Sequence, residues 1–385
     1  MNSCTPTTRK GHNAVSAEFA GLAARKNLGR DDLAKLLGAG EPEEIEAVRA
    51  EAERVLLEHC GDGVYLRGLV EASNACACDC LYCGIRKSNR GVNRYTLSAD
   101  EIMSCARQCA DYGYGSMVIQ SGERADRKFI DLVAGVVDRI KRETRTEKQP
   151  EGLGITLCIG QQSYETYKRL YDAGAHRYLL RIETTNPALF ARIHPSDQSF
   201  ESRVECLAML RQIGYQVGTG VMIGLPGQTL ENLADDILFF AKYDIDMIGM
   251  GPFIPHPETP LGDASCPAVP DRVRLALLMI AATRLKLRDV NIASTTALQA
   301  LDPVGREKGL KFGANVIMPQ MSPLDVRQDY QLYPGKPCLD ENAKECQSCL
   351  NMRIEFAGRK IGLYAWGDSL HARKRRGSAD EKPDA

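Results

Sequence analysis

The sequence of 385 residues has almost no net charge and no long apolar run. Its 49 lysines and arginines balance 50 aspartates and glutamates, so the formal net charge of −1 gives no overall field that would attract nucleic acid or an acidic membrane. No stretch is apolar enough to span a bilayer, and the polar N-terminal residues lack the apolar region of a signal peptide. These absences predict a cytoplasmic protein that binds neither membrane nor nucleic acid.

Cysteine, in contrast, is unusually abundant for a cytoplasmic protein, with 14 residues. Disulfide-rich secreted scaffolds are also dense in cysteine, but they are short and loop-rich, whereas this chain is long and regularly patterned. Reduced thiols that bind metal are therefore the better interpretation of the clustered cysteines. The isolated cysteines are expected to be small buried hydrophobic residues, namely Cys60, Cys105, Cys109, Cys158, Cys206 and Cys266.

Short apolar runs alternate with helical stretches along most of the chain. Eight such runs predict an α/β protein with a (β/α)8 TIM barrel. An open doubly wound sheet is the alternative, but the Gly-x-Gly-x-x-Gly that would mark a dinucleotide-binding sheet does not follow the first run. The predicted strands are residues 64–73, 116–121, 153–160, 177–184, 216–224, 246–253, 291–296 and 313–318.

Composition divides the chain into four expected segments. Residues 1–60 are predicted to form an N-terminal helical extension, and residues 61–330 the barrel. Residues 331–372 form a C-terminal segment with a second cysteine cluster, and the charged residues 373–385 are expected to be a disordered tail.

A first cysteine cluster directly follows the first predicted strand. Cys76, Cys80 and Cys83 are separated by three and then two residues, at the end of a barrel strand where active sites of this fold form. Thiolates at this spacing suit iron–sulfur or zinc. Zinc sites usually close with four protein ligands, whereas three thiolates leave one iron of a 4Fe–4S cluster open, as a reactive site requires. Cys78 is interpreted as a non-ligand, and zinc or simple packing remains the alternative.

This Cys-x-x-x-Cys-x-aromatic-Cys pattern, with Tyr82 as the aromatic residue, resembles the radical S-adenosylmethionine (SAM) superfamily. The resemblance implies a metal-binding enzyme whose 4Fe–4S cluster binds SAM through the open iron and works under anaerobic conditions. One electron from the cluster would cleave SAM to a 5′-deoxyadenosyl radical, while the protein supplies orientation and excludes competing reactions.

Charged and glycine-bearing strand ends supply further candidate contacts for SAM. Gln120-Ser121-Gly122-Glu123 resembles the Gly-Gly-Glu motif of the superfamily, although an ordinary turn is the alternative. Arg181 and Glu183 are expected on the same inward face of the fourth strand, where charges are costly unless they are paired or bind a ligand. Arg203 can clamp a carboxylate, with a structural ion pair as the alternative.

Two more segments lie where SAM contacts are expected. The segment 220–227 resembles the glycine-rich stretch that lies against adenine in the superfamily, and Met222 would be a soft apolar contact. Thr295 and Thr296 end the seventh predicted strand at the rim of the barrel, where β-branched strand residues without a role in binding are an equally good interpretation.

From about residue 60 to 360 the chain resembles the radical SAM maturase of FeFe hydrogenase, the HydE type; the most discriminating stretches are GPFIPHPETPL (251–261) and QLYPGK (331–336). Biotin synthase and methylornithine synthase share the barrel and the SAM motifs and are the alternatives, although no Tyr-Asn-His-Asn-type motif of biotin synthase is found. The resemblance assigns SAM contacts to Gln120, Ser121, Arg181, Glu183, Arg203, Met222, Met247, Thr295, Thr296 and Tyr330.

The same resemblance implies the function and the partners. The enzyme would act in assembly of the two-iron subcluster and dithiolate bridge of the hydrogenase, on a small molecule or a small iron–carbonyl–cyanide–cysteine complex. Ferredoxin or flavodoxin would supply electrons, and the other hydrogenase maturases would be partners. An iron–sulfur carrier without catalytic activity is the alternative, but a carrier has no need of an inward Arg181, Glu183 and Arg203.

A second cysteine cluster, Cys338, Cys346 and Cys349, lies in CLDENAKECQSC. The polar residues between these cysteines predict a surface loop that holds a second iron–sulfur cluster, either 2Fe–2S or 4Fe–4S. Zinc with a fourth ligand from elsewhere is the alternative. Since some HydE-type maturases lack this cluster, it is expected to be an accessory to the chemistry.

Overall fold

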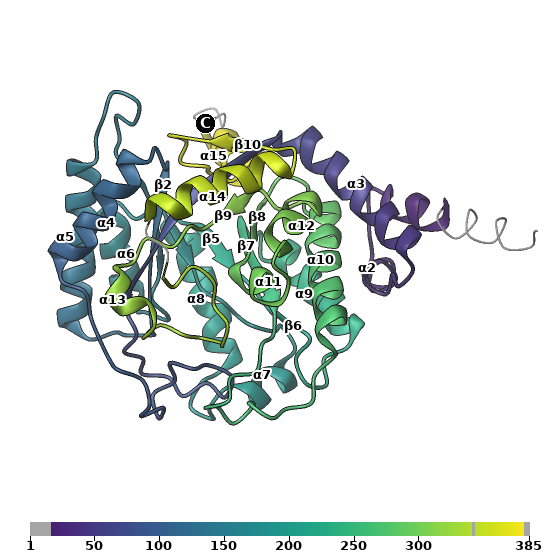
Figure 1. Cartoon of the computed structure of the whole chain (residues 1–385), viewed down its shortest axis with the longest axis horizontal. Coiled ribbons are helices and arrows are strands. Elements are labelled where there is room, and N and C mark those ends of the chain that lie inside the picture. The colour runs from purple at the N-terminus through teal and green to yellow at the C-terminus, as the bar shows by residue number, and fades with distance from the viewer. Residues whose placement is uncertain (1–16, 341–342, 381–385) are drawn as a thin grey trace, which may run out of the picture.

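The computed structural model describes residues 17–340 and 343–380. Eight parallel strands form a barrel in chain order, and pairing of the first strand with the last closes it (Figure 1). This confirms the predicted (β/α)8 TIM barrel. The barrel strands are β1 (Gly63–Ser73), β2 (Ser116–Ser121), β3 (Gly154–Cys158), β4 (Arg177–Leu179), β5 (Gln216–Thr219), β7 (Met247–Pro252), β8 (Asn291–Ser294) and β9 (Val316–Ile317).

Helices alternate with the strands and cover the outside of the barrel (Figure 1). Helices α4 to α9 each begin at a capping side chain whose oxygen accepts a hydrogen bond from the backbone N–H three residues later. The helices are α4 (Ala99–Asp111), α5 (Arg127–Glu143), α6 (Tyr164–Asp172), α7 (Pro187–Ile193), α8 (Phe200–Ile213), α9 (Leu230–Lys242), α10 (Val269–Lys286), α11 (Thr296–Leu301), α12 (Gly305–Lys311) and α13 (Leu324–Arg327).

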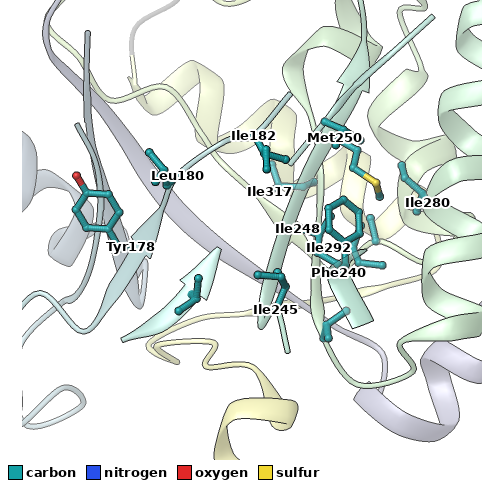
Figure 2. Close-up of a cluster of buried hydrophobic side chains, with 14 of the residues drawn as sticks. Tyr178, Leu180, Ile182, Phe240, Ile245, Ile248, Met250, Ile280, Ile292 and Ile317 are labelled. Carbon is teal, nitrogen blue, oxygen red and sulfur yellow. The ribbon is translucent and has the colours of Figure 1, made fainter. Parts of the chain in front are cut away.

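The main hydrophobic core lies between the outer faces of the strands and these helices (Figure 2). Isoleucines from β7, β8 and β9 meet Phe240 of α9 and Ile280 of α10, and all are buried. Two N-terminal helices, α2 (Arg30–Leu37) and α3 (Pro42–Cys60), extend this layer by packing on α9 and α10. The core thus holds the strands and the outer helices together, and the loops at the strand ends are not needed for this packing.

The C-terminal residues return to the barrel. After α14 (Ala343–Phe356), the strand β10 (Lys360–Gly362) pairs with the start of β1. Residues 366–368 then cross the N-terminal end of the barrel, where the Arg177 guanidinium donates to Trp366 O at 2.8 Å and Asn291 donates to Gly367 O at 2.8 Å. That end of the barrel is closed, so the opposite end is the one available for a site.

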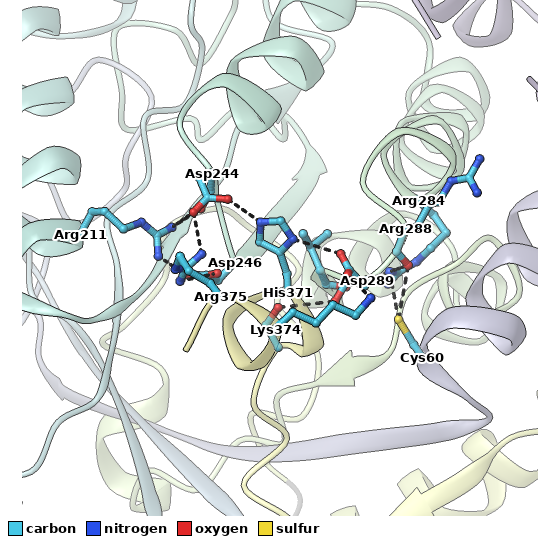
Figure 3. A network of polar contacts seen from close by, with 12 residues as sticks. Cys60, Arg211, Asp244, Asp246, Arg284, Arg288, Asp289, His371, Lys374 and Arg375 are labelled. Carbon is cyan, nitrogen blue, oxygen red and sulfur yellow. Dashed lines mark hydrogen bonds and ion pairs between the residues drawn. The ribbon is translucent and has the colours of Figure 1, made fainter. Parts of the chain in front are cut away.

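The chain next to this closure differs from the expected tail. Residues 373–380 belong to helix α15 (Leu370–Asp380), and residues 381–385 lie outside the described part. Arg375 pairs with buried Asp246 at 2.9 Å, and His371 lies between Asp244 and Asp289 (Figure 3). Where the sequence predicted a disordered tail from residue 373, the structure has a helix whose residues Lys374 and Arg375 pair with barrel carboxylates.

Six of the eight predicted strands are shorter in the structure, and in two of them the difference affects site residues. Residues 181–184 leave the strand after β4, and the run 216–224 divides into β5 and a separate strand β6 (Met222–Ile223), which pairs with β7. Gly220 lies at the break, where a Cβ would come within 1.8 Å of Gly249 O. Arg181 and Glu183 consequently lie on a loop, so their position does not follow from strand alternation.

Among the described residues, no helix has the length and the apolar character needed to cross a lipid bilayer.

Candidate active site

The cysteine loop, residues 74–96, follows β1 at the open end of the barrel. Backbone hydrogen bonds fix it from three sides: Ala77 N donates to Glu123 O at 2.8 Å, Leu81 N to Ile193 O at 2.9 Å and Gly84 N to Leu332 O at 3.0 Å. The acceptors belong to the loop after β2, to the last residue of α7 and to the segment near residue 332. Parts of the chain far apart in sequence thus hold the cysteines in place.

Glycine permits the closest of these contacts. A Cβ on Gly122 would lie 2.4 Å from Ala75 O and 2.7 Å from Cys76 Cβ, closer than the 3.0 Å below which Cβ atoms essentially never approach other atoms. The glycine of the predicted Gly-Gly-Glu-like motif is therefore required by the packing of the β2 loop on the cysteine loop. Its neighbour Ser121 donates its hydroxyl to Gly122 O at 2.6 Å and stabilises the same turn.

The thiols of this loop differ in their surroundings. The Cys76 sulfur accepts hydrogen bonds from Cys78 and from Glu123 N, the latter at 3.3 Å, and these lower the pKa of Cys76 to about 7 although burial opposes the shift. Burial raises the pKa of Cys80 to about 12 and also raises that of Cys83. The Cys78 thiol instead accepts a hydrogen bond from Gln198 Nε2 at 2.6 Å.

A cavity opens beside the cysteine loop at the C-terminal ends of the strands. The space between its walls is about 930 Å³, including the part that is open to solvent. Its walls bring together predicted residues from the cysteine loop and from the regions of four strands, β2, β4, β6 and β8, namely Tyr82, Cys83, Gln120, Arg181, Glu183, Met222, Thr295 and Thr296.

Charged and polar atoms in this cavity are only partly satisfied by the protein. Arg181 Nε lies 3.0 Å from Glu183 Oε1, and burial raises the pKa of Glu183 although Arg181 opposes the shift. Among the described residues, the buried atoms Glu183 Oε2 and Thr295 Oγ1 have no hydrogen-bond partner. Buried polar atoms are normally paired, so these two are free to bind a polar ligand.

These features fit SAM with a 4Fe–4S cluster. Glu183 Oε2 can accept from a ribose hydroxyl, Thr295 can donate or accept, and Met222 and Phe253 offer apolar contact to a flat ring. Cys83 belongs to the cavity wall, which places one expected cluster ligand beside the polar groups. Within the described residues, no group of three His, Cys, Asp or Glu side chains could hold a single metal ion.

Seven residues predicted for the first cluster or for SAM lie outside the cavity wall, namely Cys76, Cys80, Ser121, Glu123, Arg203, Met247 and Tyr330. Arg203 is buried on α8, 3.5 Å from Glu123, whose carboxylate raises the pKa of the guanidinium against the effect of burial. Tyr330 lies behind Gln120, whose amide donates to its hydroxyl at 3.1 Å. Arg203, Glu123 and Tyr330 therefore support the site from behind.

Met247 is the predicted residue that the structure does not bring to the site. It begins β7 at the closed end of the barrel, where its sulfur lies 3.1 Å from an Arg67 guanidinium nitrogen. Met247 points into the lumen of the barrel. Strand alternation predicts that a residue faces inward, but it does not tell a residue in the lumen from one at the rim, where the site lies.

Sequence reasoning missed a buried ion pair in the cavity wall. Glu71 of β1 is 2% exposed and accepts from Gln320 at 2.7 Å and from Lys336, the last residue of QLYPGK. Lys336 also donates to Tyr330 O at 3.1 Å. The available signal in the sequence was Glu71 itself, a glutamate at an inward position of an apolar strand. Its ion pair with Lys336 holds the QLYPGK turn against the barrel.

The second cysteine cluster differs from the expected surface loop. Cys349 lies on helix α14, where Arg353 Nε donates to its sulfur at 3.2 Å, and Cys338 precedes the helix with a left-handed φ of 63°. The side chain of Cys346 lies outside the described part. The two cysteines of AKECQSC are three residues apart, a spacing that fits a helix, and this pattern was more informative than the polarity of the residues.

A family model described as the radical SAM superfamily matches residues 70–240, which span the end of β1, the cysteine loop and strands β2 to β5. The barrel, the cysteine loop and this match define a radical SAM enzyme, a class that uses a 4Fe–4S cluster and SAM. The chain is 42% identical to the FeFe hydrogenase maturase subunit HydE of Thermotoga maritima, over 89% of this chain and 94% of that protein. The chain belongs to the HydE family.

Other relatives are more distant. Biotin synthase of Corynebacterium jeikeium is 27% identical, over 81% of this chain and 89% of that enzyme. Among solved structures, methylornithine synthase (PylB) has a TM-score of 0.73 at 24% identity, covering 91% of this chain and 98% of the other. HydG from Carboxydothermus hydrogenoformans has a TM-score of 0.74 at 19% identity, with coverages of 92% and 80%. These two likenesses establish the fold.

Proposed function

We propose that this enzyme acts in assembly of the active-site cluster of FeFe hydrogenase, on the two-iron subcluster and its dithiolate bridge. The observation that carries the proposal is the 42% identity to HydE over nearly the whole chain. The identities to biotin synthase and 3-methylornithine synthase are 27% or less over similar lengths, which favours the HydE-type function over these alternatives.

In this proposal Cys76, Cys80 and Cys83 hold the 4Fe–4S cluster, and Cys78 does not. When bound and reduced, the cluster supplies the electron that cleaves SAM to a 5′-deoxyadenosyl radical. The hydrogen bonds from Glu123 N and Cys78 to Cys76 favour its thiolate form, the form that binds metal. Burial of Cys80 and Cys83 makes their free thiolates costly, so cluster binding would compensate for that cost.

The cavity residues would bind and orient SAM. Glu183 would accept from the ribose diol with Arg181 holding its carboxylate, and Thr295 would supply a further polar contact. Gln120 and Tyr330 would fix the β2 edge of the site, while Met222 would lie against the adenine. Walls formed by Phe253, Ile254 and Leu332 would exclude water from the reacting atoms.

The substrate would be small, because SAM would fill part of the same cavity. A small iron–carbonyl–cyanide–cysteine complex is the proposed substrate class. The proposed partners are the other hydrogenase maturases and a one-electron donor such as ferredoxin or flavodoxin. Cys338, Cys346 and Cys349 would hold an accessory iron–sulfur cluster.

A cell-free maturation assay tests this function. Extract that contains the other maturases and the unmatured hydrogenase, but no HydE-type protein, should gain hydrogen evolution when the purified, reconstituted enzyme and SAM are added. Protein with Glu183→Gln should support much slower activation at limiting SAM. If the wild-type enzyme cleaves SAM but leaves the hydrogenase inactive, the enzyme class stands and the proposed role in maturation is wrong.

A further inference from the structure

Asp236 is a carboxylate that the proposed site does not use, although it is fully buried. It lies on α9, in the outer helix layer, with 0% exposure. Its Oδ1 accepts from Thr185 N at 2.7 Å and from Thr185 Oγ1 at 2.6 Å, and its Oδ2 has no partner among the described residues. Burial raises the pKa of Asp236 to about 7, against the two hydrogen bonds from Thr185.

Thr185 lies two residues after Glu183, whose backbone has an unfavourable left-handed conformation. Glu183 has a φ of 64°, a left-handed conformation that non-glycine residues rarely adopt. Glu183 N donates to Gly220 O, and Met222 N donates to Glu183 O, both at 2.9 Å. Such a conformation persists only where the surroundings fix it. The hydrogen bonds to Gly220 and Met222 fix one side of the segment, and Asp236 fixes the other.

The same segment continues to the cysteine loop. Asn186 caps α7 by accepting from Leu189 N at 3.0 Å, and at the end of this helix Ile193 O accepts from Leu81 N at 2.9 Å. His194 then makes an edge-to-face contact with Tyr82, with ring centres 5.5 Å apart. Asp236 therefore holds the middle of a segment that presents Glu183 to the cavity at one end and supports the cysteine loop at the other.

We propose that Asp236 is a positioning residue for SAM binding, which acts by anchoring Thr185 and thereby holding Glu183 in its strained conformation. The inference rests on the proposed contact of Glu183 with SAM. The anchor needs an acceptor oxygen rather than a charge. Asp236→Asn retains that oxygen, whereas Asp236→Leu has a similar size and removes it.

The test compares SAM dissociation constants of the reconstituted variants. Asp236→Leu should raise the dissociation constant about tenfold, since the two hydrogen bonds that hold Thr185 are lost. Its kcat at saturating SAM should stay close to that of the wild type. Asp236→Asn should bind SAM within about threefold of the wild type. In protein without cofactors, amide exchange of residues 183–186 should be faster for Asp236→Leu only.

Asp246 offers a matched control. It is also 0% exposed and accepts from a backbone amide, Val217 N, at 2.9 Å, but it lies at the closed end of the barrel beside Arg211 and Arg375 (Figure 3). Asp246→Asn should lower thermal stability without changing SAM affinity. If Asp236→Leu does not fold, Thr185→Val removes the hydroxyl alone and should weaken SAM binding, whereas Thr185→Ser should not.

Three results would overturn the inference: wild-type affinity in Asp236→Leu and Thr185→Val, equal losses of affinity in the Asn and Leu variants, or an equal loss in Asp246→Asn. A wild-type protein that does not bind SAM would instead contradict the proposed function. The two failures are therefore distinguishable.

Discussion

Replacing Gly122 with alanine should disrupt the cluster site while leaving the barrel folded. The new Cβ would lie 2.4 Å from Ala75 O, whereas ordinary contact begins at 3.4 Å, so the β2 loop and the cysteine loop must separate by about 1 Å. A misplacement of about 1 Å at a reacting centre costs roughly 100-fold in rate, and overpacking costs about 1–3 kcal/mol in stability. We expect Gly122→Ala to retain its far-ultraviolet circular dichroism, bind less iron and form 5′-deoxyadenosine about 100-fold more slowly.

Gly135 provides the control, because it lies within helix α5 and its Cβ would meet nothing within 4 Å. Gly135→Ala should be stabilised by about 0.5–1 kcal/mol, with normal iron content and turnover. The assay is iron per chain after anaerobic reconstitution, followed by 5′-deoxyadenosine formation from SAM. If Gly122→Ala binds iron and turns over like Gly135→Ala, close packing of the two loops does not position the cysteines.

Three further predictions concern SAM, pH and the second cluster. Glu183→Gln should weaken SAM binding by about one to two decades without loss of iron, because a charge-assisted contact contributes roughly 1.5–3 kcal/mol, and unchanged affinity in a SAM titration would remove Glu183 from the site. Hydrogen bonding to Asp289 raises the pKa of His371 to about 9 from 6.5, so its stabilising effect should be complete below pH 6.5 and lost as the pH rises through 9. His371→Gln should lack this decline in thermal unfolding scans, and an identical pH profile would contradict the assignment. Replacing the three cysteines of the second cluster together should lower iron per chain but leave SAM cleavage with dithionite largely intact; these residues are Cys338, Cys346 and Cys349. If the triple variant keeps its first cluster but does not cleave SAM, the second cluster is part of the mechanism.

The sequence was sufficient to predict the barrel because apolar runs and helical stretches alternate without interruption. Each strand is buried on the helix side, so residues such as Ile248 and Ile292 mark the strands irrespective of the loops. Residues at strand ends, including Gln120 and Thr295, were predicted at the cavity for the same reason, since every strand of a parallel barrel ends at one rim.

Contacts between segments distant in sequence could not be predicted in this way. Glu71 and Lys336 are 265 positions apart, and only the closed barrel brings them together. The left-handed turn at Glu183 has no glycine to mark it and depends on Gly220 and Asp236 from other elements. Likewise, the basic residues after Arg373 are ordered by carboxylates at the ends of barrel strands, which composition alone does not reveal.

The most direct test of the central claim measures 5′-deoxyadenosine formed from SAM by the anaerobically reconstituted, reduced enzyme and by its single cysteine variants. We predict that the wild type and Cys78→Ala form 5′-deoxyadenosine, and that Cys76→Ala, Cys80→Ala and Cys83→Ala form none. Normal formation by any of these three variants would contradict the assignment of the cluster ligands. Absence of formation by the wild type, with its iron bound, would contradict the enzyme itself.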